Sequence, residues 1–143
     1  MLFLSRGEKR MAEIEVTYFE KLKMAEFSRN TAVLRKLSEE GDPFIRAVIA
    51  QNEDTPISLF KELSKDKDAC VRLAVAENSY APPKVLDSLS QDENQEVREA
   101  VYLNRNTKEE TLKKMEEENE ELVKDLKNYK ERILYLKDNP SYR

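Results

Sequence analysis

The chain carries the segment IRAVIAQN at residues 45–52, VRLAVAEN at 71–78 and VREAVYLN at 97–104. Each copy starts 26 residues after the one before, opens with an aliphatic residue and Arg, and ends in Asn. A fixed period of roughly 20 to 50 residues marks a repeat architecture, because one unit cannot bury its apolar face alone and stacked neighbours complete the core. The three segments therefore predict an α-solenoid, a scaffold with a binding role. They do not identify the ligand.

Residues that start helices recur with the same period. Asp42-Pro43 and Thr55-Pro56 each place a capping side chain before a proline, which fits a first helical turn because no hydrogen bond is lost there. Thr107 with Glu110 has the pattern of a capping box. Such short helices are unstable alone and must share one core. The starts predict three helix pairs, at residues 30–39 with 43–51, 56–64 with 69–77, and 82–90 with 95–103.

Composition favours helices and argues against an enzyme. Of the 143 residues, 38% are charged and 8% aromatic, with two Gly and no Trp. The absence of His and the single Cys70 exclude a Cys/His metal cage, a disulfide framework and a Ser-His-Asp triad. We expect Cys70 to be a half-buried packing residue. No cofactor is expected, and the net charge of −4 disfavours nucleic-acid binding by the whole molecule.

The repeats resemble the variant leucine-rich repeat, a bacterial family whose layout is related to HEAT repeats. The resemblance spans about residues 30–115 and rests on Leu63-Ser-Lys-Asp66, Val71-Arg72, Val75-Ala76-Glu77-Asn78, Pro82 with Leu86 and Leu89, and Asn52-Glu-Asp-Thr55-Pro56. It implies a right-handed curved stack with a binding role and no chemistry. The chain departs from the family by having Glu53, Ser79 and Arg105 where a proline usually follows the turn Asn. An iron–sulfur centre of the family's kind cannot form with one cysteine.

The two ends of the chain differ from the repeats. Residues 1–10 are interpreted as a disordered arm or a mis-annotated leader before Met11, and residues 11–27 as an amphipathic helix that covers the first repeat. The expected organisation is a helical-repeat domain over 11–115, followed by a C-terminal helix extension over 116–143 that could form a coiled coil.

Arg46, Arg72 and Arg98 recur at the repeat period and have two interpretations. They could follow a phosphate backbone or an acidic partner. Alternatively each pairs with an acid at the same spacing, as Asp66 and Asp92 suggest, and has a structural role, which we favour. The turn residues Asn52, Asn78 and Asn104 are expected at helix C-termini, in left-handed geometry and bonded to local backbone.

Three residues near the turns are candidate partner-binding residues. Tyr102 replaces Ala50 and Ala76 of the earlier repeats, and Tyr80 lies in a turn. Arg105 occupies the next turn. Exposed aromatics are common anchors of interfaces. The alternative for Tyr102 is packing beneath the C-terminal helix.

Residues 107–138 contain neither Gly nor Pro, and apolar residues recur at spacings of three and four. This predicts one long helix with a coiled-coil seam, in which Asn119 would fix the register of a parallel homodimer. A fourth repeat is the alternative, although it needs a helix start at Glu120, a poor cap. The candidate self-association residues are Asn119, Leu122, Leu126, Tyr129, Ile133 and Leu136.

Together these patterns predict a non-enzymatic, cytoplasmic scaffold or adaptor that binds a protein, without a membrane segment. A homodimer is one form it could take. The first alternative is a HEAT-like nucleic-acid binder that uses the three Arg residues. The second is a small inhibitor encoded by a mobile element, which would bind a host protein.

Overall fold

The computed structural model describes residues 15–139 and 141, and in this part of the chain the secondary structure is helical, with no strand. The all-α expectation is confirmed. The helices are α2 (Tyr18–Phe27), α3 (Thr31–Glu40), α4 (Pro43–Gln51), α5 (Ile57–Leu63), α6 (Ala69–Glu77), α7 (Pro83–Leu89), α8 (Gln95–Leu103), α9 (Glu109–Glu118) and α10 (Glu120–Asp138).

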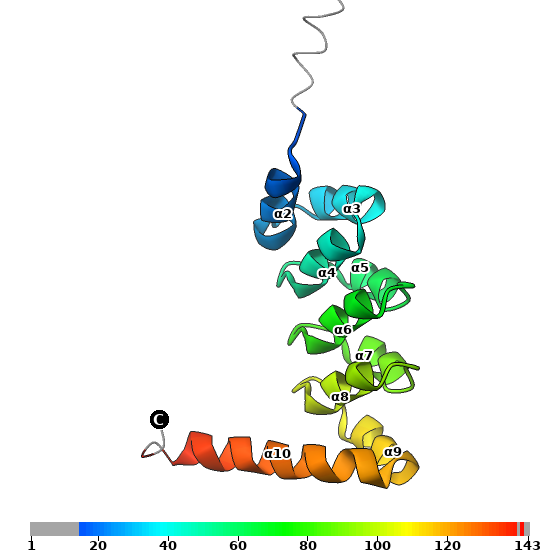
Figure 1. Cartoon of the computed structure of the whole chain (residues 1–143), viewed down its shortest axis with the longest axis vertical. Coiled ribbons are helices and arrows are strands. Elements are labelled where there is room, and N and C mark those ends of the chain that lie inside the picture. The colour runs from blue at the N-terminus through cyan, green and yellow to red at the C-terminus, as the bar shows by residue number, and fades with distance from the viewer. Residues whose placement is uncertain (1–14, 140, 142–143) are drawn as a thin grey trace, which may run out of the picture.

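The helices form two layers along the long axis of the molecule (Figure 1). In one layer α2, α4, α6, α8 and α10 pack on each other in that order, and we call them the second helices. The first helices α3, α5 and α7 lie beside them, each packed on its neighbouring second helices. The core runs between the layers, and its largest fully buried side chains are Phe60, Leu34, Ile49, Leu59, Leu86, Val71, Val75, Val97 and Val101.

The caps of the second helices agree with the sequence, whereas the predicted threonine caps are wrong. The Asp42 carboxylate accepts from Ile45 N at 2.9 Å, with Pro43 at the first turn. Thr55 and Thr107 instead donate their hydroxyls, at 2.6 Å each, to the carbonyls of residues 49 and 101 in the preceding helix. A buried threonine hydroxyl is thus used to satisfy a helix C-terminus, and α5 and α9 start without a side-chain cap.

Buried asparagines join each repeat to the one before. The amide of Asn78 donates to Ala50 O at 2.8 Å and to Asn52 O at 3.3 Å, while its oxygen accepts from Tyr80 N at 2.8 Å. Asn52 and Asn104 make the same three kinds of bond one layer earlier and one layer later. We call this set the asparagine ladder.

The structural role expected of these residues is correct, but the expected left-handed geometry is wrong. All three asparagines have φ of −69° to −72° and ψ of 120° to 130°. Their side chains reach the previous repeat rather than only the local backbone. The orphan carbonyls at the end of each second helix therefore receive donors from the next layer.

The same register continues into α10. Lys130 lies 26 residues after Asn104, and its ammonium donates to Tyr102 O at 3.5 Å, the carbonyl equivalent to Ala76 O. Val123 is buried at the position that matches Val97. The first part of α10 is therefore the second helix of a fourth layer, and α9 supplies the first helix.

The prediction of one unbroken C-terminal helix is wrong. The backbone of Asn119 has φ −149° and ψ 69°, which separates α9 from α10. The side chain of Asn119 accepts a hydrogen bond from Leu122 N. The N-cap of α10 therefore lies one residue before Glu120, the position that the repeat period predicts for it. Asn119 consequently cannot serve as the register residue of a continuous coiled coil.

The N-terminal helix is shorter than expected. It begins at Tyr18, where Thr17 and Glu20 form a capping box, rather than at residue 11. It does cover the first repeat, because α2 packs on both α3 and α4. The proposed leader over 1–10 and the first residues of the expected helix lie outside the described residues.

Asn78→Ala should lower the free energy of unfolding by about 3 kcal/mol, because it leaves two carbonyls and one N–H without their partners in the interior. Urea denaturation measures the effect. Asn128→Ala, on an exposed part of α10, is the matched control and should change stability little. Equal changes in the free energy of unfolding for the two variants would contradict a stabilising role of the asparagine ladder.

Candidate functional site

Arg46 and Arg72 are engaged within the protein. Arg46 donates to both carboxylate oxygens of Asp66, at 2.6 and 3.1 Å, and to Gly41 O at 2.8 Å. Arg72 repeats the pattern with Asp92 at 2.7 and 3.0 Å, and its side chain is only 9% exposed. Each pair links one repeat to the turn of the next, so these guanidiniums are not free to bind phosphate.

Arg98 differs from the other two. It donates to Asp92 O at 2.6 Å and to Glu93 O at 3.1 Å, both of them backbone carbonyls. The acid at the matching spacing, Glu118, accepts from Gln91 instead. Within the described residues Arg98 forms no salt bridge. The expectation of an acid partner is therefore met at Arg46 and Arg72 and not at Arg98.

The pKa values of the two buried carboxyls are low. Burial acts to raise the pKa of Asp66 and Asp92, but the hydrogen bonds from Arg46 and Arg72, with backbone donors, outweigh it. The pKa of each therefore lies below its ordinary value.

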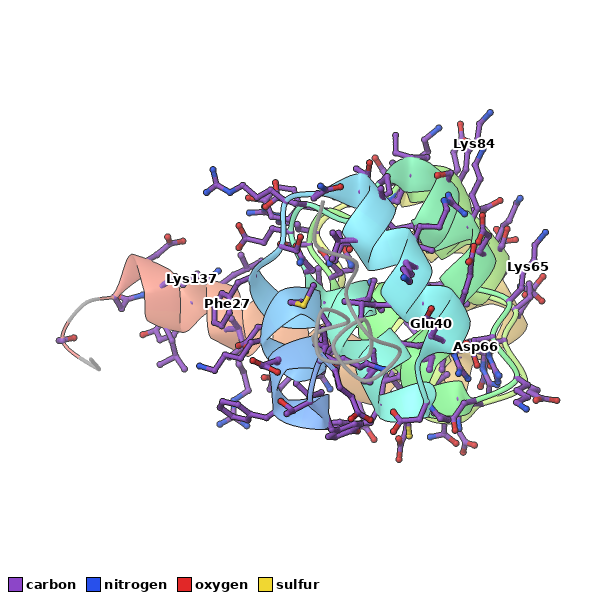
Figure 2. The ribbon with its side chains drawn as sticks, turned by 90° about the horizontal axis from the view of Figure 1, so that it is seen from above. Phe27, Glu40, Lys65, Asp66, Lys84 and Lys137 are labelled. Atoms are coloured by element: carbon purple, nitrogen blue, oxygen red, sulfur yellow. The ribbon has the colours of Figure 1, made fainter. Side chains whose placement is uncertain are left out.

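Three exposed lysines that could contribute to a basic surface, Lys61, Lys65 and Lys84, lie on the side of the first helices. Figure 2 shows Lys65 and Lys84 on one side of the molecule and Phe27 and Lys137 on the other. Lys61, Lys65 and Lys84 border a shallow hollow of about 210 Å³ on α5 and α7. The carboxylates of Asp66 and Asp92 bind Arg46 and Arg72 at the turns after these helices, so acidic groups interrupt any basic strip that would join these lysines to the two arginines.

Tyr102 is not an exposed anchor, which corrects its assignment as a partner-binding residue. It is 3% exposed beneath α10, and its hydroxyl donates to Glu116 at 3.0 Å. The Lys130 ammonium lies 5.3 Å from the centre of its ring. Burial and the Glu116 hydrogen bond raise the pKa of Tyr102 to about 12. Its role is to hold α10 against α8.

The other candidates are dispersed. Tyr80 and Arg105 are exposed in successive turns, as expected. Cys70 is exposed rather than half-buried, because its position in α6 faces away from the core. In α10, Leu122 and Leu126 are half-buried. Tyr129, Ile133 and Leu136 follow in the second half of the same helix; Tyr129 is 54% and Leu136 40% exposed, and Ile133 is half-buried.

A groove lined by two phenylalanines lies between α2 and α4, and the sequence patterns did not predict it. Its volume is about 400 Å³, within the usual range of binding pockets. We call it the α2–α4 groove. Its lining residues are Phe19, Leu22, Lys23, Glu26, Phe44, Val48, Gln51 and Asn52.

Phe44 is the signal that could have revealed this groove. Its equivalents in the next two repeats are Cys70 and Glu96, so a large aromatic replaces smaller or polar residues on an outward face. That is the same reasoning by which Tyr102 was selected. Phe44 is 61% exposed and Phe19 is 67% exposed, so both rings are accessible at the groove.

Carboxylates extend from the groove along the second helices. Glu26 lines the groove itself. Glu77 and Glu96 are exposed and Glu99 is half-buried, at positions equivalent to the groove residues or beside them in α6 and α8. Apart from the inward-facing arginines, these are the charged residues within α6 and α8. The outward face of the second helices is therefore apolar at the α2–α4 groove and acidic along α6 and α8.

A larger hollow of about 510 Å³ lies between α9 and α10, but it has a different character. Its lining consists of positively charged lysines and negatively charged glutamates, with Val123 as the one apolar residue. Unlike the α2–α4 groove, it has no aromatic side chain in its lining that could contact an anchor residue. We therefore place the candidate binding site at the α2–α4 groove.

In the part of the chain that the structure describes, no cluster of three or more His, Cys, Asp or Glu residues is arranged to hold a metal ion. No helix there is both long and apolar enough to cross a membrane. No protein-family model matches the chain, and neither a curated protein nor a solved structure matches it.

Arg72→Ala should lower the free energy of unfolding by about 3 kcal/mol, because it leaves the Asp92 carboxylate buried without its partner. Arg35→Ala is the control, since the Arg35–Glu62 pair is largely exposed and should cost under about 1 kcal/mol. Thermal and urea denaturation distinguish the two. Unchanged stability of the Arg72 variant, with loss of nucleic-acid binding, would favour the opposite interpretation.

Stability should also fall in acid. The unfolded carboxyls titrate near pH 4, so the contribution of the two depressed pKa values is complete above about pH 5. It is lost as the pH falls through the lower folded pKa values. Urea denaturation over this range should show the decline, and Asp92→Asn should reduce its slope. A slope unaffected by Asp92→Asn would contradict this assignment.

Proposed function

We propose that this chain is a non-enzymatic protein-binding scaffold, built as a right-handed α-solenoid of the variant leucine-rich or HEAT-like kind. The 26-residue register of the asparagine ladder supports the repeat assignment. The observation that carries the binding role is the α2–α4 groove, where Phe19 and Phe44 stand exposed. Large exposed aromatics beside a hollow are the usual anchors of protein interfaces.

The chemistry of the site favours an amphipathic helix with basic margins. The groove supplies an apolar floor for residues on one face of a helix, as in helix-in-groove recognition. Glu26 in the groove and Glu77 farther along the face supply negative charge for lysine or arginine at the ligand's margins. The groove residues belong to helices packed on each other, so the site is largely preformed.

The same observations favour a protein ligand over a nucleic acid. Arg46 and Arg72 are bound to Asp66 and Asp92, which removes them as phosphate ligands. The remaining exposed lysines would supply weak, salt-sensitive contacts. The exposed, unpaired Cys70 fits a reducing compartment such as the cytoplasm, where we propose that the protein acts.

Helical peptides with one common apolar stripe, flanked by Lys, Gln or Glu, test this function. The Lys-flanked peptide should bind tightest by fluorescence anisotropy, and Phe44→Glu should weaken it about tenfold or more because it removes an anchor ring. Ile57→Glu is the matched control: Ile57 is 62% exposed, close to the 61% of Phe44, but belongs to α5.

Absence of binding by every peptide would overturn the proposed function. Equal weakening by the two variants would show that the groove is not the site. Duplex and single-stranded oligonucleotides belong in the same titration, and tight binding that survives physiological salt would favour the nucleic-acid alternative.

A further inference from the structure

Two partly exposed apolar surfaces are left uncovered by the other described residues (15–139 and 141), and they lie at opposite ends of the stack. The α2–α4 groove is at the N-terminal end, and the distal half of α10 (residues 129–138) is at the C-terminal end, where α10 runs crosswise to the stack and its end projects to one side (Figure 1). The groove cannot receive the helix of its own chain, because α6 and α8 lie between them. A second copy of the chain can supply it.

The distal half of α10 has the residue pattern proposed for the ligand of the groove, an apolar stripe with basic residues at its borders. Tyr129, Ile133 and Leu136 follow each other at spacings of four and three, which places them on one side of a helix. Arg132 and Lys137 occupy the two borders of that stripe by the same helical spacing. The segment is therefore an apolar stripe with basic margins.

The groove provides the complementary margins. Glu26 lies in its wall, and Glu77 lies farther along the face on α6. The groove's one lysine, Lys23, is held over the rings of Phe19 and Phe27, with its ammonium 5.4 and 5.7 Å from their centres. The positive charge of Lys23 therefore interacts with the two aromatic rings. The carboxylate of Glu26 can then bind an arginine or lysine of the ligand.

We propose that the distal half of α10 of one copy docks in the α2–α4 groove of the next, so that copies associate head to tail. This inference rests on the proposed function and names the partner of the same groove. Such a contact joins two different surfaces, so it can repeat and build chains of copies. A segment this short buries less than a standard interface, and the association is therefore weak and depends on concentration.

Sedimentation velocity of the intact protein over a range of concentrations tests the proposal. The wild type should shift from monomer to dimers and longer chains. Phe44→Glu, which impairs the groove, and the double variant Tyr129→Glu with Leu136→Glu, which impairs the helix, should each remain monomeric. Ile57→Glu is the control and should associate like the wild type.

A mixture of the two impaired variants gives the decisive result. One variant keeps an intact helix and the other an intact groove, so an equimolar mixture should form dimers and stop there. Self-association of Phe44→Glu at the wild-type level would overturn the proposal in favour of pairing between two α10 helices.

A wild type that stays monomeric would also overturn it. That outcome would leave peptide binding by the groove unaffected, so failure of this inference is distinguishable from failure of the proposed function.

Discussion

The arrangement of this molecule depends on the hydrogen bonds from buried asparagine amides to the carbonyl ends of the preceding helices. Helices of nine residues leave much of their backbone unsatisfied at the ends and are marginal alone. Asn78 and its equivalents supply the missing donors from the next layer. The Arg72–Asp92 pair ties adjacent repeats together a second time, near the start of the same helix. α6 is thereby fixed to its neighbours at both ends, which defines the spacing of the layers around it.

The same interaction distinguishes α10 from the earlier second helices. At position 130 the chain has lysine where the ladder has asparagine, and α10 continues to Asp138 instead of turning back. Lys130 still reaches Tyr102 O, so the fourth layer forms before the helix leaves the stack. The projecting apolar segment is therefore a direct result of one missing turn. At the other end, among the described residues, α2 leaves the groove beside α4 open.

The periodic part of this fold was predictable, and the exceptions to the period were not. The 26-residue spacing indicated paired helices, their core positions and the interlayer partners of Arg46 and Arg72. It could not show that Thr55 and Thr107 face inward, because a hydroxyl before a helix suits either role. The break at Asn119 was not predicted because Asn119, the N-cap of α10, lies one residue before the position given by the 26-residue period. The groove depends on α2, which belongs to no repeat, so its depth required the packing of α2 on α4.

The ladder bonds of Asn78 and Asn104 join equivalent positions of neighbouring layers, so the natural unit of length for this part of the molecule is one repeat. A tandem duplication of 26 residues would introduce one asparagine amide and the carbonyls that receive it, so the inserted layer would be complete. An insertion of another size inside a second helix would displace an asparagine donor from its acceptor carbonyls, whereas a longer exposed turn need not. The stack can therefore be lengthened or shortened by whole repeats with the ladder complete, while the groove at one end and the projecting helix at the other keep their structure and move apart.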